Sequence, residues 1–133
     1  MSGLRKLTLC ISILLIFVVI TAGCGQTEGN DEFAFPEVNF TISNTEVNAG
    51  EPITFDAYVS VEGEPITDAD RVEFEIWHES QEDGEHESIL IEHAGEGHYK
   101  LEKSFEQAGV YYIYYHVDTM ALHLMEKFEF TIK

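Results

Sequence analysis

The chain has 133 residues, with 25 acidic and seven basic side chains and a formal net charge of −18. Such an acidic surface repels phosphate backbones, which excludes nucleic acid as a partner. Its two cysteines, Cys10 and Cys24, both lie near the N-terminus, so the rest of the chain has neither a disulfide framework nor a thiolate metal site.

The first 23 residues have the pattern of a bacterial lipoprotein signal, which we expect to be helical. Arg5 and Lys6 are followed by an apolar run over residues 7–20, and Thr, Ala and Gly precede Cys24. The run is shorter than the roughly 20 residues of a membrane-spanning helix. We therefore expect removal of residues 1–23, lipidation of Cys24, and anchoring at the extracytoplasmic face of the cell membrane. The mature chain would keep five basic and 25 acidic residues, a formal charge of −20.

The rest of the chain is predicted to be a flexible tether followed by one domain. Residues 24–34 are mostly polar and include glycines, as in a linker. Residues 35–133 suffice for one hydrophobic core, and they hold short β-rich runs separated by turn signals. This pattern predicts an all-β domain, an immunoglobulin-like antiparallel β-sandwich of about seven strands. The predicted strands are 38–43, 53–61, 71–78, 87–93, 98–105, 110–118 and 125–132.

Alternation along a strand assigns one core face and one solvent face. In the strand over residues 71–78, Val72, Phe74 and Ile76 are expected in the core, while Glu75 faces water. Tyr111 follows a turn glycine, as in the tyrosine corner of sandwich folds. The next strand should then point Tyr111, Ile113, Tyr115 and Val117 inward and Tyr112, Tyr114, His116 and Asp118 outward.

The last two predicted strands carry the most unusual pattern of the chain. If residues 119–122 form a four-residue loop, His116 lies opposite Met125. Asp118 then lies opposite His123, and all four side chains share one face, with directly opposed Cβ atoms about 4.5–5.5 Å apart. Imidazole and thioether ligands suit copper better than magnesium, calcium or structural zinc. The pattern predicts a copper site formed by His116, His123, Met125, Met120 and Asp118.

Other histidines leave alternatives open. His78 and Trp77 end a strand that can lie beside the hairpin, so either of them could complete the site. His93 and His98 flank a turn and could hold a metal as a pair, whereas His86 lies in an acidic loop and is expected to be solvated. The hairpin histidines could equally be ordinary surface residues, with the methionine capping the edge of the core.

Together these features resemble a known family. Residues 35–133 are similar to the YtkA-like domain, a relative of FixH-type proteins, in the single sandwich domain, the run from Gly97 to Phe105, Gly109-Val110-Tyr111, and His116-Val117 followed by His123-Leu124-Met125. The lipobox Thr-Ala-Gly-Cys that ends at Cys24 adds to the resemblance. The resemblance implies an extracytoplasmic protein associated with copper handling and with assembly of haem-copper respiratory oxidases. His116, His123 and Met125 match the positions expected to bind copper. Proline often follows the His-x-Met element of this family, whereas this chain has Glu126.

The sequence is consistent with two functions of different classes. The first is a membrane-anchored copper-binding protein that passes copper to an oxidase subunit or another acceptor, with the tether raising the effective concentration. The alternative is a metal-free β-sandwich interaction module at the cell envelope, with Trp77, Tyr112 and Tyr114 as an exposed aromatic patch. No sequence motif of a nucleophile elbow or a zinc protease is present, so we do not expect an enzyme.

Overall fold

The computed structural model describes residues 33–133. The predicted signal peptide, the lipidation site Cys24 and residues 24–32 of the predicted tether lie outside the described residues. Within residues 33–133, no helix has the length and apolar character needed to cross a membrane. The elements are β1 (Pro36–Ile42), β2 (Glu46–Val47), β3 (Pro52–Val61), β4 (Glu64–Pro65), β5 (Arg71–His78), the 3-10 turn η1 (Glu79–Gln81), β6 (Glu87–Leu90), β7 (His93–Gly95), β8 (His98–Ser104), β9 (Gly109–Thr119) and β10 (Leu122–Ile132).

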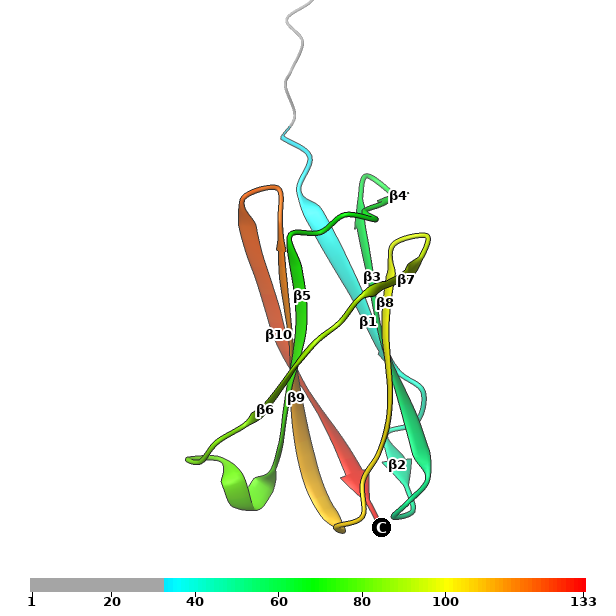
Figure 1. Ribbon diagram of the computed structural model, residues 1–133, viewed down its shortest axis with the longest axis vertical. Coiled ribbons are helices and arrows are strands. Elements are labelled where there is room, and N and C mark those ends of the chain that lie inside the picture. Colours follow the sequence, from blue (N-terminus) through cyan, green and yellow to red (C-terminus); the bar gives the residue numbers. More distant parts are fainter. Residues whose placement is uncertain (1–32) are drawn as a thin grey trace, which may run out of the picture. The chain divides into compact units, whose positions relative to one another are not determined.

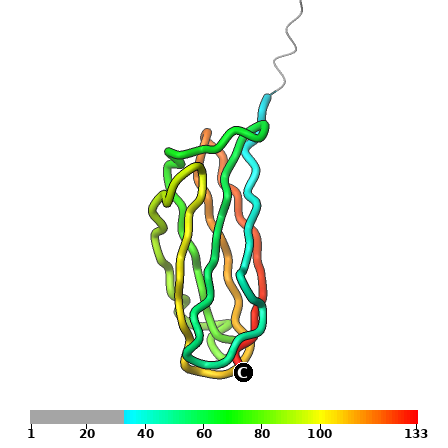
Figure 2. Tube along the Cα trace, turned by 90° about the vertical axis from the view of Figure 1, so that its right-hand side faces the viewer, coloured from blue at the N-terminus to red at the C-terminus, as the bar shows by residue number. Residues whose placement is uncertain are grey.

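The strands form two sheets that pack face to face, as Figure 1 and Figure 2 show. One sheet has the order β1-β3-β8-β7, with β4 paired to β3, and the other has the order β2-β10-β9-β5-β6. The pairings are antiparallel except that of the two-residue strand β2 with β10. The predicted all-β sandwich is confirmed.

The core lies between the sheets and follows the predicted alternation. Every predicted inward residue of β9 is buried, and so are Val72, Phe74 and Ile76 of β5. The Tyr111 hydroxyl donates a hydrogen bond of 3.0 Å to the carbonyl oxygen of Gln107, which confirms the tyrosine corner. The two sheets are therefore fixed against each other at the start of β9, the strand that carries His116.

The predicted strand over residues 87–93 is in fact two strands in different sheets. β6 pairs with β5, whereas β7 pairs with β8, and Figure 1 shows the chain crossing from one sheet to the other between them. At the crossing Ile91 is buried, and its N–H donates to the carbonyl of Val72 at 2.8 Å. Ile91 is apolar because it enters the core at the point where the strand is interrupted. The apolar run therefore continues through the interruption, and the sequence predicted one strand. The two-residue strands β2 and β4 were not predicted.

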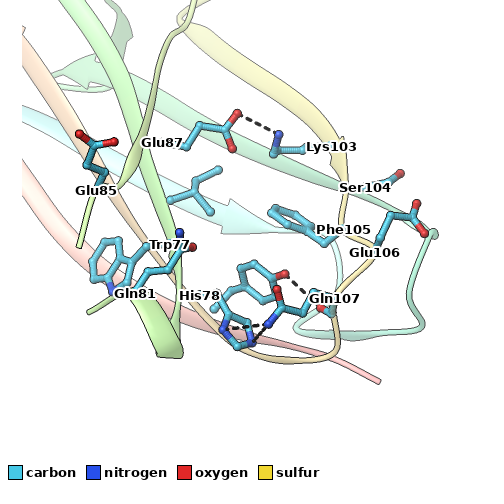
Figure 3. Close-up of a pocket in the computed structure, with 12 residues that line it drawn as sticks. Trp77, His78, Gln81, Glu85, Glu87, Lys103, Ser104, Phe105, Glu106 and Gln107 are labelled. Atoms are coloured by element: carbon cyan, nitrogen blue, oxygen red, sulfur yellow. Dashed lines mark hydrogen bonds and ion pairs between the residues drawn. The ribbon is translucent and has the colours of Figure 1, made fainter. Parts of the chain in front are cut away.

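His78 has a structural role at the far end of β9 from His116. It is buried, its Nδ1 lies 2.7 Å from Ser80 Oγ, and its Nε2 lies 3.1 Å from the Ala108 carbonyl oxygen. Figure 3 shows His78 and Gln107 among the residues that line a pocket of about 430 Å³ there. The suggestion that His78 completes a site beside His116 is therefore wrong, because β5 pairs His78 with Tyr111 instead.

Candidate metal site

The hairpin of β9 and β10 has the register that the sequence predicts. His116 pairs with Met125, and Asp118 pairs with His123. The connection is tighter than predicted, because Thr119 pairs with Leu122 and only Met120 and Ala121 remain in the turn. Both turn residues have positive φ, 51° and 61°, as a two-residue type I′ turn requires. The expected four-residue loop is therefore wrong. The facing pairs are still as predicted, because pairing Thr119 with Leu122 extends the same register by one pair towards the turn.

The predicted metal-binding side chains share the outer face of the sheet. His116 and Asp118 alternate with Val117 and Thr119, which are buried. Met125 is 48% exposed and Met120, in the turn, is 51% exposed. The set is thus open to solvent on one side and supported by the core on the other.

The two imidazole rings face each other with one nitrogen each. His116 Nδ1 lies 3.5 Å from His123 Nε2. The other nitrogens point to carboxylates: His116 Nε2 lies 2.8 Å from Glu75 Oε2, and His123 Nδ1 lies 2.5 Å from Asp118 Oδ1. A carboxylate accepts an N–H, so in neutral rings we assign the lone pairs to the two facing nitrogens.

The separation of the facing nitrogens fits two ligands of one metal ion. Imidazole nitrogen binds zinc at about 2.0–2.1 Å, so two such nitrogens on one ion are about 3.3–4.1 Å apart for tetrahedral to linear angles. The 3.5 Å between His116 Nδ1 and His123 Nε2 falls in this range. A carboxylate on the second nitrogen is also the usual surrounding of a metal-bound histidine, because it fixes the ring and its tautomer.

Glu75 belongs to the site, although strand alternation predicted only that its side chain faces water. β5 lies beside β9, where Glu75 pairs with Tyr114, and its side chain reaches His116 across the strands. Its second oxygen, Oε1, lies 2.6 Å from His86 Nδ1. Burial alone would raise the pKa of Glu75, but hydrogen bonds and charges from His86 and His116 lower it below the ordinary value of 4.5. In the sequence, only the alternation along the strand bore on Glu75, and it predicted that the side chain lies on the outer face.

The lowered pKa of Glu75 predicts a stability that depends on pH. A carboxyl whose folded pKa lies below its unfolded value contributes stability above the unfolded value and loses it as pH falls through the folded one. We expect the unfolding free energy of the parent to exceed that of Glu75→Gln at about pH 5 and the difference to shrink towards about pH 3. Urea unfolding of both proteins across this range is the measurement. A difference that stays constant over the range would contradict the prediction.

His86 is not solvated as expected. Its ring stacks on Trp77 at 4.1 Å between centroids with an interplanar angle of 6°, and its side chain is 20% exposed. Trp77 lies on the outer face of β5 but is only 4% exposed, because His86, Tyr112, Tyr114 and other neighbours cover it. The predicted exposed patch of three aromatic residues is thus wrong for Trp77, which weakens the case for a metal-free binding face.

The histidines beside the β7–β8 turn do not form a pair. His93 Nε2 accepts the N–H of Gly97 at 2.9 Å, whereas His98 Nδ1 lies 2.9 Å from Asp56 Oδ2. Among residues 33–133, no three His, Cys, Asp or Glu side chains come together as a metal-binding group.

Glu126, which stands where proline often follows the His-x-Met element, does not interrupt the hairpin. β10 runs without a break from Leu122 to Ile132, and Glu126 pairs with Tyr115. Burial raises the pKa of Tyr115, and the charge and hydrogen bond of Glu126 raise it further. Glu126 is accommodated at the strand edge, so Met125 keeps its place opposite His116.

A family model and solved structures are similar to this chain. The family model described as YtkA-like matches residues 36–116, from the start of β1 to His116, and so ends before His123 and Met125. No curated protein matches the chain significantly. The crystal structure of an engineered protein is similar with a TM-score of 0.55 and 18% identity, over 74% of this chain and 20% of that one, so the chain spans about a fifth of its length. A superoxide reductase (neelaredoxin) from Ignicoccus hospitalis has a TM-score of 0.46 and 15% identity, over 74% of this chain and 80% of that one.

Proposed function

Because this chain belongs to the YtkA-like family, we propose that it is an extracytoplasmic copper-binding protein that delivers copper for assembly of respiratory oxidases. A lipid on Cys24 would hold it at the bacterial cell membrane. The observation that carries the proposal is the pair of imidazole nitrogens, on His116 and His123, that face each other at 3.5 Å. Each ring is held by a carboxylate on its other side, from Glu75 and Asp118.

The donor set suits cuprous ion as cargo. His116 Nδ1 and His123 Nε2 would bind the ion, and Met125, directly opposite His116, would supply a thioether. Met120 in the turn offers a second sulfur. Thioethers are soft ligands that select Cu(I) over hard divalent cations. Asp118, first expected to be a ligand, is better suited to orient His123, because it already accepts the Nδ1 hydrogen of that ring.

The position of the site favours transfer of the ion. Met120 and Met125 are about half exposed, so an acceptor's ligands can approach the ion from the solvent side. A fully extended segment from Cys24 to Phe33 would span at most about 36 Å, which would confine the domain near membrane-embedded acceptors and raise its effective concentration. Transfer needs no catalytic residue, and we propose no enzymatic activity.

Substitution of the methionines tests the nature of the cargo. Met125→Leu keeps volume and apolar character but removes the sulfur, so we expect Cu(I) affinity to fall by about tenfold or more, with a smaller loss for Cu(II). Competition with a chromophoric Cu(I) chelator, using the chain purified in detergent, measures the loss. Met120→Leu in parallel separates the two thioethers. If neither variant nor the double variant changes Cu(I) affinity, the thioethers are not ligands.

A further inference from the structure

We infer that His86 is a positioning residue for the copper site and acts on His116 through Glu75. The inference rests on the proposed function, since His116 is one of the proposed ligands. His86 would not touch the ion. It would hold the carboxylate that holds the ligand.

The two oxygens of Glu75 are divided between two histidines. Oε1 lies 2.6 Å from His86 Nδ1, and Oε2 lies 2.8 Å from His116 Nε2. A carboxylate held at one oxygen can turn about its bond to the side chain, whereas one held at both oxygens has its plane fixed. The direction from which Glu75 accepts the His116 hydrogen therefore depends on His86, and with it the direction in which His116 Nδ1 points.

His86 is itself fixed by packing. It lies flat on Trp77, and Lys127 Nζ lies 5.1 Å from the Trp77 ring centroid and 4.1 Å from that of Tyr112. Trp77 is buried on the outer face of the sheet. The place of the His86 ring is thus set by its packing on Trp77. The ring can therefore determine where the Glu75 carboxylate lies.

The second nitrogen of His86 supports this role. Nε2 is buried and has no hydrogen-bond partner among the described residues, and a buried polar atom without a partner destabilises the folded state. A histidine placed only for solubility would expose that nitrogen to water. In the observed placement Nε2 has no partner, whereas Nδ1 bonds to Glu75. The bond to Glu75 is therefore the polar interaction that this placement of His86 secures.

The test uses two substitutions of His86 and a matched control, all in the full chain in detergent. His86→Ala removes the donor to Glu75, whereas His86→Asn places an amide donor near the position of Nδ1. His98→Ala removes a comparable histidine–carboxylate pair, with Asp56, from the other sheet. The readouts are the Cu(I) dissociation constant and, without copper, the tautomer of His116 by ¹⁵N NMR. Trp77 is the only tryptophan, so its fluorescence reports on the loss of the His86 stack.

We expect His86→Ala to weaken Cu(I) binding by about tenfold, the lower end of what loss of an outer partner costs, and to mix the His116 tautomers. His86→Asn should restore most of both properties, and His98→Ala should change neither. If His86→Ala leaves the affinity and the His116 tautomer as in the parent, the inference is overturned. If the parent itself binds no Cu(I), the proposed function fails and the inference fails with it. If the parent binds Cu(I) and His86→Ala leaves the His116 tautomer unchanged, the inference fails alone.

Discussion

Replacement of His116 and His123 together by alanine is expected to lower Cu(I) affinity by more than about 100-fold, beyond the loss caused by removing an orienting partner alone. These rings provide the two facing nitrogens, 3.5 Å apart, and the thioethers that remain cannot replace them. Titration against a competing Cu(I) chelator measures the loss. Each single variant should lose part of the affinity, because one imidazole and one thioether would remain.

The matched control is the double variant His93→Ala with His98→Ala. These histidines belong to the other sheet and are bound to Gly97 and Asp56, so their loss should leave Cu(I) binding unchanged. Circular dichroism and urea unfolding establish that both double variants remain folded. Equal Cu(I) affinity of the two double variants would show that the hairpin does not hold the ion.

The largest effect on stability is expected for Gly109→Ala. Gly109 begins β9 with φ of 137°, and a Cβ atom there would overlap the His78 ring and approach Glu79 Oε1 at 3.1 Å. His78 is buried and bonded at both nitrogens, so it cannot move without losing those bonds. Backbone strain of about 1–3 kcal/mol and the loss of a buried polar contact of similar size together predict destabilisation of about 2–6 kcal/mol. Urea unfolding checks the value.

Gly95→Ala separates strain from overlap. Gly95 has a comparable φ of 126°, and an added Cβ would meet no atom within 4 Å. We expect this variant to lose only the strain component, so Gly109→Ala should be the less stable of the two by more than about 1 kcal/mol. Equal unfolding free energies of Gly109→Ala and Gly95→Ala would mean that overlap of the added Cβ atom with the His78 ring does not destabilise the protein.

The part of the site within the last hairpin could be predicted because it depends on local sequence. Alternation fixed which residues of β9 face outward, and the number of residues between Asp118 and His123 fixed which pairs face each other. Whether the turn held two or four free residues did not matter to that register. His116, His123 and Met125 therefore came together in sequence and in structure alike.

The parts supplied by other strands could not be predicted. Glu75 reaches His116 only because β5 pairs with β9 in one particular register, and no short turn links these strands to reveal it. His86 lies between η1 and β6, in a segment whose acidic composition indicated a solvated loop. Its stack on Trp77 is a contact between a loop residue and a strand residue, and alternation within one strand does not predict such a contact. The same packing buries Trp77 on a face where alternation placed it in solvent.

X-ray absorption of the Cu(I)-loaded chain tests most directly the claim that His116 and His123 share one ion. With one equivalent of copper, we expect two imidazole nitrogens and at least one sulfur around the metal. In His123→Ala the spectrum should lose one imidazole contribution and keep the sulfur. A copper environment without imidazole, or a spectrum that is the same in parent and variant, would show that His116 and His123 do not share one ion.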